Sequence, residues 1–169
     1  LPEVETMRRG VAAAAGATIA SVEKLPCPRK PIGIAPRIDR LNARAAGRRI
    51  DAVERVGKRV SLRLDSGGTL ILEPRMTGLV GAGDPPDPLY LRVRIDLEAG
   101  DLSHCWCWDR RGRGKVRLYD PCEFAEAFGP GKLGPDGLVV SPAEYRERIG
   151  CSRRAIKVAL LDHRAVAGI

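Results

Sequence analysis

Aromatic and histidine side chains are scarce in this sequence, and several common catalytic motifs are absent from it. Phe, Trp and Tyr together make up 4% of the 169 residues, and two residues are His. Proteins that bind single-stranded nucleic acid stack successive bases on aromatic side chains, so the composition argues against a platform of that kind. No Walker phosphate loop, GxSxG nucleophile motif or HExxH zinc motif occurs in the chain. The sequence therefore indicates none of the enzyme classes that these motifs mark.

The sequence also lacks the apolar stretches that target or anchor a protein. No apolar run approaches the roughly 20 residues that a membrane-spanning helix requires, and the first residues have neither region of a signal peptide. The chain begins at Leu1 rather than at a methionine, and an apolar helical pattern over residues 155–169 stops without a cap. We therefore expect a fragment of a longer protein, cut at both ends, that makes no membrane contact.

The five cysteines form no recognisable disulfide or zinc pattern. They are Cys27, Cys105, Cys107, Cys122 and Cys151, an odd number at scattered spacing, unlike the framework of a small disulfide-rich domain. Cys105 and Cys107 form a C-x-C pair rather than the C-x-x-C pair of a zinc ribbon, and alternation would point both thiols to one face of a strand. We expect thiols in the core, no metal site in this chain, and a reducing, cytoplasmic compartment.

An excess of basic residues is the main compositional signal. Lys and Arg number 29 against 21 Asp and Glu, so the formal net charge is +8. Such a charge favours an anionic partner, nucleic acid first, although an arginine-rich proteome would give an ordinary soluble protein the same balance. With 44% hydrophobic residues, the chain is long enough for one full domain and part of another.

The residue pattern of the first two thirds predicts a helix followed by many strands. Residues 2–15 fit a helix, because Pro2 suits its first turn and Gly16 suits its end. Residues 17–25 alternate like a strand, whereas four prolines over residues 26–36 exclude regular structure and predict a loop. Further strands are predicted over residues 49–56, 59–65, 69–73, 90–97, 102–108 and 115–119.

These elements indicate an α+β fold, an antiparallel β-sandwich or partly open barrel with a leading N-terminal helix. The Ser-Gly-Gly sequence at 66–68 predicts a hairpin turn. A Gly- and Pro-rich stretch then indicates a linker, so we expect a sandwich domain over residues 1–128 and a linker over 129–140. The start of a truncated helical domain is expected over 141–169, with a capping box at its beginning.

The strongest candidate for a binding site is the basic segment 109–117. Five of its nine residues are Lys or Arg, and two glycines interrupt them between predicted strands. Glycine lets a backbone approach a ligand closely, and a guanidinium group matches phosphate with two parallel hydrogen bonds. A solvated hairpin tip is the competing interpretation, but Arg clustered with Gly favours a binding role.

Weaker candidates lie elsewhere in the chain. Met76, where a strand ends in a loop, could be an apolar wedge that replaces an extruded base, although such a methionine is more often part of a core. Lys58 stands alone at the mouth of a strand, where most lysines are simply solvated. A last helical unit is predicted over residues 153–166. On it Arg153 and Lys157 share a face and, with Arg154, form either a phosphate clamp or an exposed stripe.

Six segments, in this order, make the chain resemble the formamidopyrimidine-DNA glycosylase and endonuclease VIII family, in its formamidopyrimidine-DNA glycosylase branch. The most specific are LPEVETMRRG at 1–10 and AIKVALLDHRAVAGI at 155–169. The weaker ones are VGKR at 56–59, RMTG at 75–78, DRRGRG at 109–114 and KLGPDGL at 132–138. The match runs from end to end, and it implies that the helical part begins a helix–two-turns–helix DNA-binding domain.

The resemblance implies base-excision repair of duplex DNA that contains oxidised purines, such as 8-oxoguanine and formamidopyrimidines, or abasic sites. Members of the family flip the damaged base out, attack its sugar with the amine of an N-terminal proline, and cut the strand by elimination from the Schiff base. A secondary α-amine has a lower pKa than lysine, so it is partly neutral and nucleophilic near neutral pH. The parent would be a DNA glycosylase with AP lyase activity, acting as a monomer.

Specific roles follow from the resemblance. The catalytic Pro-Glu pair of the family directly precedes the leucine that matches Leu1, so we expect the printed chain to lack that pair and to be inactive alone. Pro2 and Glu3 match a second, structural Pro-Glu pair. Lys58 matches a lysine that contacts phosphate beside the lesion and is assigned the proton transfer of the elimination. Met76 matches the wedge that fills the gap left by the flipped base.

The remaining matches concern DNA contacts. Arg111 matches the arginine that faces the orphaned cytosine, and Lys157 matches a lysine implicated in handling damaged purines. Arg153 and Arg154 lie where contacts to the DNA backbone are made.

Several positions depart from the family pattern. Arg113 replaces a wedge phenylalanine, Tyr90 replaces a phosphate-binding histidine, and Glu73 with Pro74 replaces a usual His-Leu, so the preferred lesion stays open. The zinc finger of the family would follow the printed residues, so zinc is expected only in the parent and no cofactor is expected in this chain.

Two alternatives to a purine-lesion glycosylase stay open. The oxidised-pyrimidine branch of the same family is disfavoured by the LPEVE start. A non-catalytic homologue that binds duplex DNA but has lost the Pro-Glu pair would belong to a different functional class. The codons before Leu1 separate that homologue from an enzyme, because a Met-Pro-Glu sequence there restores the catalytic pair.

Overall fold

The computed structural model describes residues 2–150 and 152–168. Predictions about the start at Leu1, the fifth thiol at Cys151 and the end of the closing pattern at Ile169 lie outside the described residues. The helices are α1 (Pro2–Gly10), α2 (Ile38–Ala45), α3 (Pro121–Phe128), α4 (Pro142–Gly150) and α5 (Ile156–Leu160), with short 3-10 helices η1 (Ala12–Ala14) and η2 (Pro88–Tyr90). The strands are β1 (Thr18–Lys24), β2 (Gly33–Ala35), β3 (Ile50–Val56), β4 (Arg59–Leu64), β5 (Thr69–Glu73), β6 (Gly78–Ala82), β7 (Leu91–Glu98), β8 (His104–Asp109) and β9 (Lys115–Tyr119).

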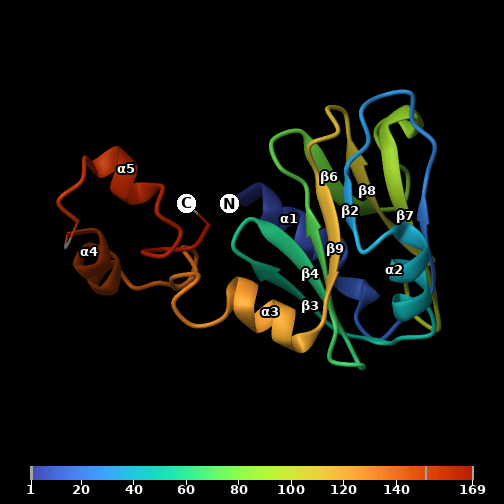
Figure 1. The fold of residues 1–169 in the computed structure, drawn as a ribbon, viewed down its shortest axis with the longest axis horizontal. Coiled ribbons are helices and arrows are strands. Elements are labelled where there is room, and N and C mark those ends of the chain that lie inside the picture. The colour runs from blue at the N-terminus through green and yellow to red at the C-terminus, as the bar shows by residue number, and fades with distance from the viewer. Residues whose placement is uncertain (1, 151, 169) are drawn as a thin grey trace.

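Two packed sheets form a sandwich, which confirms the predicted α+β fold with its leading helix (Figure 1). One sheet has the strand order β1-β7-β8-β6, and the other has the order β2-β9-β5-β4-β3. Every pair of neighbouring strands is antiparallel except β2 and β9, which run parallel. Helix α1 packs beside β3, β4 and β6, and therefore lies at one end of the sandwich.

Strand β2 shows that the prediction of a loop without regular structure over residues 26–36 is wrong. Gly33–Ala35 pairs with β9 at the edge of the sheet, in register with Lys115, Val116 and Arg117. The prolines at 31 and 36 flank this strand instead of interrupting it, and an edge strand needs ladder hydrogen bonds on one side only. A proline-rich segment can therefore still contribute a short edge strand.

Strand β6 was not predicted, because glycine occupies positions where a strand usually shows large side chains. A Cβ atom at Gly78 would overlap the Pro74 carbonyl group, and a Cβ atom at Gly81 would overlap the Trp106 ring. Glycine is therefore required at both positions, because the neighbouring groups leave no space for a side chain. The same residues remove the apolar alternation by which a strand is recognised.

The helices of residues 2–128 differ from the predictions at three places. Helix α1 ends at Gly10 and a 3-10 turn follows, so it is shorter than the predicted helix over residues 2–15. Helix α2 lies where no element was predicted, and α3 begins at a capping box that was overlooked. In that box Glu123 N donates to Asp120 Oδ1 at 2.8 Å, and Asp120 N donates to Glu123 Oε2 at 3.1 Å.

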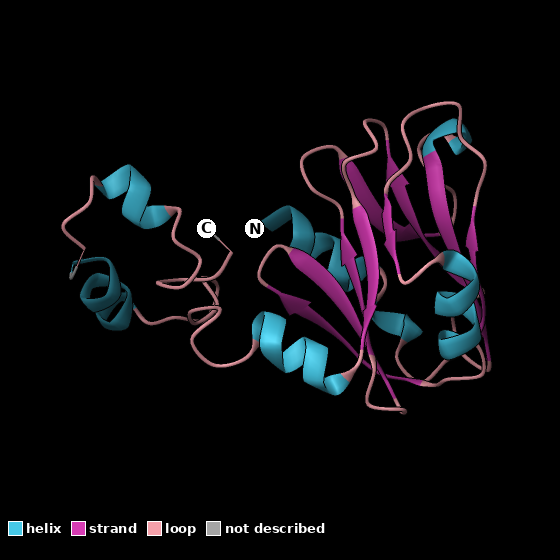
Figure 2. Ribbon diagram, in the orientation of Figure 1, coloured by secondary structure: helices cyan, strands magenta, loops and turns pink. Residues whose placement is uncertain are grey.

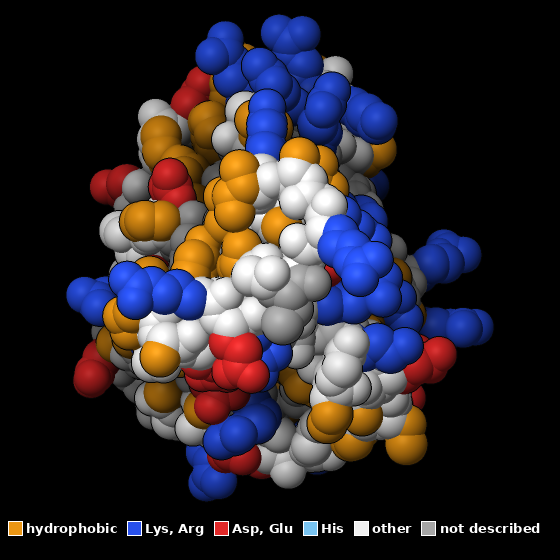
Figure 3. All heavy atoms as spheres, turned by 90° about the vertical axis from the view of Figure 1, so that its left-hand side faces the viewer, with side chains coloured by type: hydrophobic (Ala, Val, Ile, Leu, Met, Phe, Trp, Pro, Cys, Tyr) orange, Lys and Arg blue, Asp and Glu red, His pale blue; other side chains and the backbone are white. Residues whose placement is uncertain are grey.

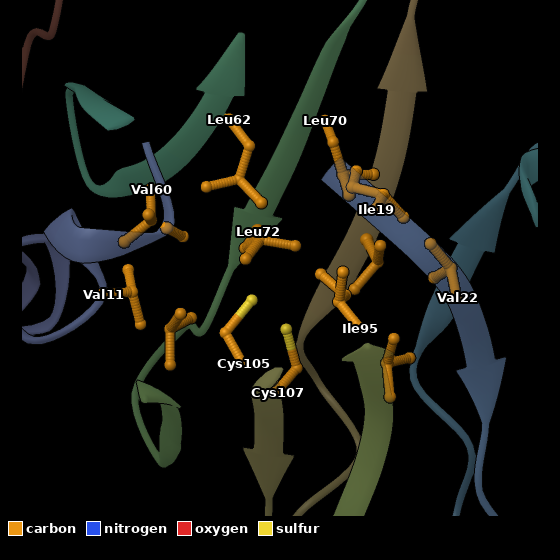
Figure 4. Packing of buried hydrophobic residues seen from close by; sticks show 14 of the residues in the cluster. Val11, Ile19, Val22, Val60, Leu62, Leu70, Leu72, Ile95, Cys105 and Cys107 are labelled. Atoms are coloured by element: carbon orange, nitrogen blue, oxygen red, sulfur yellow. The ribbon is translucent and has the colours of Figure 1, made fainter. Parts of the chain in front are cut away.

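The core between the sheets consists of aliphatic side chains and two thiols (Figure 4). Leu62 and Leu72 from one sheet meet Ile95 from the other, and all three are fully buried. Cys105 and Cys107 point from β8 into the same core, as the C-x-C spacing predicts. Burial raises the pKa of Cys105 to about 12, so the thiol stays neutral and packs as an apolar group. The described cysteines are free thiols: Cys27, Cys105, Cys107 and Cys122.

The segment after α3 leaves the sandwich as a long loop and carries α4 and α5 beside it (Figure 2). Its Gly- and Pro-rich start pairs with its own end, because Gly134 N donates to His163 O at 2.9 Å and Ala167 N donates to Pro135 O at 2.8 Å. The predicted domain limits at residues 128 and 140 stay a prediction. In the described ranges no helix is long and apolar enough to cross a membrane.

The ends of the two last helices follow local backbone conformation. Helix α4 begins after Ser141, whose hydroxyl group accepts a hydrogen bond of 3.2 Å from Glu144 N. Helix α5 begins only at Ile156, because the residue before it is extended. Arg153 therefore precedes the helix, and the prediction that Arg153 and Lys157 share a helix face is wrong.

Candidate functional site

A cavity of about 710 Å³ opens beside the first turn of α1. Its volume falls within the range of about 300–1,000 Å³ that is typical of ligand pockets. The wall is built from α1, the β3–β4 turn, the β5–β6 loop and β8. Leu133 and His163 complete it from the segment after α3, which we call the closing segment (residues 129–168). Its titratable side chains are those of Glu3, Lys58, Arg59, Glu73, Arg75 and His163, and Met76 lies at the same wall. The fold thus brings together two predicted site residues, Lys58 and Met76.

Lys58 lies in the tight turn between β3 and β4. Gly57 before it has a φ of 59°, a left-handed conformation that glycine adopts at little cost. The Gly57 carbonyl group accepts a hydrogen bond of 3.0 Å from Arg55 Nη1, which fixes the turn. The Lys58 side chain itself is exposed, so its ammonium group can meet an anion at the mouth of the cavity.

Arg55 connects this turn to α1 and to the segment after the sandwich. Its side chain is 8% exposed, and it pairs with Glu5 (Nε to Oε2, 3.2 Å) and with Asp136. Hydrogen bonds from Arg8, Arg9 and Arg55 lower the pKa of Glu5 to about 2. Because Glu5 stays ionised, the ion pairs hold α1 against β3 and keep its first turn at the cavity.

Met76 projects from the β5–β6 loop with 88% of its surface exposed. The alternative interpretation of Met76 as a core methionine is therefore wrong. Arg75 before it has a φ of 59°, which is uncommon for a residue other than glycine and costs of order 1–3 kcal/mol. The loop closes tightly because Gly78 packs on the Pro74 carbonyl group. A constrained loop thus presents an apolar side chain to solvent.

Asp109 organises the basic segment that follows β8. Its buried carboxylate accepts backbone hydrogen bonds from Arg111 (2.9 Å), Arg113 (2.6 Å) and Gly114 (2.6 Å). It also accepts a hydrogen bond of 3.1 Å from Thr77 Oγ1. Burial alone would raise the pKa of Asp109, but these four hydrogen bonds together lower it below its ordinary value. The Met76 loop and the basic loop are therefore joined through one carboxylate.

The three arginines of the basic loop, Arg110, Arg111 and Arg113, are exposed, whereas its glycines are buried. Gly112 has a φ of 64°, and a Cβ atom there would overlap the Lys30 carbonyl group. The backbone of the loop is therefore fixed by its hydrogen bonds to Asp109 and by its close packing on Lys30. The side chains of Arg111 and Arg113 are exposed. This arrangement suits binding better than a merely solvated hairpin tip does.

Glu73 and His163 are among the cavity residues that were not predicted as site residues. Glu73 pairs with Arg59 (Nε to Oε2, 3.1 Å) and with Arg75, and its only sequence signal was its departure from the family pattern. Burial lowers the pKa of His163, and the charges of Lys58 and Arg59 lower it further. No local signal could reveal His163, because the closing segment reaches the cavity only when it folds back.

The other predicted site residues do not line this cavity. Tyr90 on η2 packs edge to face against Trp108, a residue of the wall, with ring centroids 5.6 Å apart. Arg153, Arg154 and Lys157 are exposed on the closing segment, and the described cavity wall includes none of them. Figure 3 shows Lys and Arg side chains along the top and right of one face, a surface that suits an anionic partner.

Known proteins similar to this chain share one name. The formamidopyrimidine-DNA glycosylase of Chloroflexus aggregans is 36% identical over 173 residues, an alignment that covers 100% of this chain and 61% of the relative. That of Bacillus subtilis is 30% identical and is covered to the same 61%. The chain thus spans about three fifths of the length of the curated relatives that it matches.

Solved structures and a family profile agree with these relatives. The Lactococcus lactis formamidopyrimidine-DNA glycosylase bound non-covalently to DNA with an AP site matches with a TM-score of 0.77 and 25% identity, over 99% of this chain and 63% of that one. Its complex with Fapy-dG DNA gives a TM-score of 0.74 and 25% identity, over 99% of this chain and 63% of that one. The profile described as the formamidopyrimidine-DNA glycosylase N-terminal domain matches residues 1–116, which confirms the resemblance found in the sequence. The chain belongs to the formamidopyrimidine-DNA glycosylase family.

Proposed function

We propose that the chain is the lesion-binding part of a DNA glycosylase and AP lyase that removes 8-oxoguanine and formamidopyrimidines from duplex DNA. The observation that carries the proposal is the convergence of Lys58 and Met76 on one cavity beside the first turn of α1. Membership of the family supports it, as do the L. lactis complexes with AP-site and Fapy-dG DNA. The protein acts as a monomer in a reducing, cytoplasmic compartment, to which its scattered thiols point.

A flipped purine needs a pocket and leaves a gap in the base stack. The cavity of about 710 Å³ has room for a nucleobase, with apolar surface from Met7 and Trp108 and with acceptor oxygens from Glu73. Met76 is free to enter the gap, as apolar side chains do at unstacked base steps. Flipping costs a few kcal/mol, and the inserted side chain offsets part of that cost.

Arg111 and Arg113 contact the duplex beside the gap. We assign Arg111 to the base opposite the lesion, because a guanidinium group can donate two parallel hydrogen bonds to acceptors on one base edge. Arg113, in place of the wedge phenylalanine of the family, stacks on a base or contacts phosphate through its planar cation. The joint through Asp109 and Thr77 makes this loop and the Met76 loop engage the duplex together.

The chemistry at the sugar uses a nucleophilic amine and a proton donor. The resemblance assigns both to a Pro-Glu pair directly before Leu1. The proline nitrogen bonds to C1′ as the base leaves with the electrons of the glycosidic bond and a proton. The C1′–O4′ bond of the sugar then breaks, O4′ takes up a proton, and the nitrogen lone pair forms an iminium ion at C1′. This ion loses a proton from C2′, and the 3′ phosphate departs with the electrons of its bond to C3′. We assign Lys58 to that phosphate and to proton transfer.

The printed chain is proposed to bind lesions without cutting them, because its residues 1–169 do not include that catalytic pair. No cofactor takes part in these steps. We assign zinc to the parent protein on the resemblance to the family alone.

Binding and trapping experiments test this function. The printed chain should prefer a duplex with a tetrahydrofuran abasic analogue or 8-oxoguanine over an undamaged one. Met76→Ala should lose the preference, whereas Leu89→Ala, a matched change at another exposed apolar residue, should keep it. Borohydride should trap an adduct to 8-oxoguanine duplex only when Met-Pro-Glu precedes Leu1. Equal binding of damaged and undamaged duplexes would refute the proposal, and adducts with oxidised-pyrimidine duplexes alone would favour the other branch.

A further inference from the structure

A second cavity, of about 330 Å³, lies between the loop after β1 and the start of β7. It shares no lining residue with the first cavity in the described structure. Its charged lining residues are Lys24, Arg29 and Arg92, and Cys27 lies among them. The volume is several times the ~30 Å³ that a water molecule occupies in the liquid. A small ligand with its remaining hydration water therefore fits.

Arg92 makes this cavity chemically unusual. Arg92 is 2% exposed, and its Nε atom donates a hydrogen bond of 2.7 Å to Asp109 O. Its Nη2 atom is buried without a hydrogen-bond partner. A guanidinium group stays protonated in proteins, and burying such a charge without full pairing is costly. The cavity thus borders a buried cation with unused hydrogen-bonding capacity.

Nearby acidic groups do not supply the missing partner. The carboxylate of Asp109 already accepts from Thr77 and from three backbone N–H groups of the basic loop. The lining of the cavity contains no Asp or Glu, and the exposed side chains of Lys24 and Arg29 add positive charge at its rim. The site is therefore deficient in negative charge and rich in donors, which are the conditions for binding an anion with several acceptor oxygens.

We propose that this second cavity is a binding site for a phosphate group, with Arg92 as the buried cation in its wall and Lys24 and Arg29 as its rim. The phosphate belongs either to the backbone of a DNA duplex or to a free phosphate ester. The loop that lines the cavity packs against the basic loop at Gly112 and Lys30, and Arg92 holds the carbonyl group of Asp109. A bound phosphate would therefore also brace the loop that carries Arg111 and Arg113.

Protection of Cys27 from alkylation measures occupancy directly. Cys27 is a half-buried free thiol in the cavity wall, and a bound anion blocks the access of a reagent to it. The full chain is treated with N-ethylmaleimide in about 10 mM inorganic phosphate or in sodium chloride of equal ionic strength, a range suited to weak binding. Peptide mapping by mass spectrometry follows Cys27, with the exposed Cys122 as internal control. Phosphate should slow alkylation of Cys27 severalfold and leave Cys122 unchanged.

Variants separate a built site from general charge screening. Lys24→Ala with Arg29→Ala should weaken phosphate protection by about tenfold in concentration, roughly the loss of one charge-assisted hydrogen bond. Arg40→Ala with Arg44→Ala, two exposed arginines on α2, removes the same charge and should leave protection intact. Arg92→Met should abolish protection while the chain stays folded, since apolar replacement of a buried charge is often tolerated. If Arg92→Met fails to fold, the proposal is tested by the variant with Lys24→Ala and Arg29→Ala alone.

A duplex arm identifies the source of the phosphate. If undamaged duplex DNA protects Cys27, and the rim pair removes this protection, the site takes a backbone phosphate. If inorganic phosphate protects and the duplex does not, the site takes a free phosphate ester. Equal alkylation in phosphate and chloride with no duplex effect would overturn the proposal, as would protection that survives in the rim pair. None of these readouts depends on lesion recognition or strand cleavage.

Discussion

The sandwich (residues 2–128) and the closing segment (residues 129–168) differ in how much apolar surface each buries. The sandwich holds a continuous core between its two sheets. In the described part of the closing segment the buried apolar side chains are those of Ile149, Ala159, Val166 and Ala167. Large apolar side chains that remain exposed there are Leu138, Val139, Ile156, Val158 and Leu161. The sandwich is therefore stabilised by its own core, and the closing segment is held mainly by polar contacts.

This difference matches what each region contributes to the site. Lys58 and Met76 stand on turns of the sandwich, where packing fixes the backbone. His163 reaches the same cavity from the closing segment, whose position depends on hydrogen bonds near Pro135 and on the pair between Arg55 and Asp136. Residues on a tightly packed framework keep their geometry, whereas residues on a polar joint can adjust their positions.

Truncation of a core side chain should separate the sandwich from the closing segment most strongly, as measured by the free energy of unfolding. Leu72→Ala in the fully buried core should lower the free energy of unfolding by about 2–5 kcal/mol, because it removes apolar contacts and leaves a cavity. The matched change Leu161→Ala, at a residue that is 61% exposed, should alter it by no more than about 0.5 kcal/mol. Urea denaturation measures both values. Similar losses for both variants would mean that the closing segment shares the core's cooperativity.

The ion pair between the regions should have the next largest effect. Asp136→Asn removes the charge that pairs with the nearly buried Arg55, and should destabilise the closing segment by about 1–3 kcal/mol. Hydrogen exchange should accelerate at Gly134, Gly137 and Ala167 more than in β4 and β5. Asp162→Asn, at the more exposed pair with Arg154, serves as control. Unchanged exchange at Gly137 would show that the joint does not depend on this pair.

Base discrimination should depend on the sandwich loop alone. Arg111→Ala should remove the preference for cytosine opposite an abasic analogue, a loss of about 1–3 kcal/mol for a bidentate contact. Fluorescence anisotropy with each of the four opposing bases measures it, and Arg153→Ala should weaken binding to all four duplexes equally. An equal loss across the four bases for Arg111→Ala would indicate a phosphate contact instead of base recognition.

Salt dependence isolates a smaller electrostatic effect at the cavity mouth. Lys58→Ala should weaken duplex binding and reduce the slope of log K against log salt by about 0.9, the value for one phosphate contact. Titrations at several salt concentrations give the slope. Arg44→Ala, an exposed charge on α2, should leave the slope unchanged. The same slope for Lys58→Ala and the wild type would contradict a phosphate contact by Lys58.

Acid titration tests the anchor of α1 at Glu5. The pKa of Glu5 is lowered to about 2 from its ordinary value of 4.5. A carboxyl group with a lowered folded pKa contributes stability that is fully present above 4.5 and is lost as the pH falls towards 2. The stability difference between wild type and Glu5→Gln should therefore shrink across this window in urea titrations. A difference independent of pH would argue against the ion pairs of Glu5.

Local patterns predicted the elements whose signals are short-range. Strands β5 and β9 were predicted with the bounds that the structure shows, because an apolar run after a glycine turn marks β5 and regular alternation marks β9. Strand β6 escaped prediction because Gly78 and Gly81 are required by the Pro74 carbonyl group and the Trp106 ring. Such contacts come from residues that are adjacent only in the folded chain. The same reason explains why Glu73 and His163 were overlooked at the cavity.

The sequence by itself determined the family, the α+β class and the residue types available for DNA contact, because motif order, alternation and charge are properties of the chain. Only the tertiary structure decided that Met76 is exposed, that Thr77 and Asp109 join two loops, and that Arg92 lies buried with an unpaired nitrogen. Burial and hydrogen-bond partners depend on which distant segments meet. Packing of the two sheets brings those segments together, and no local pattern records it.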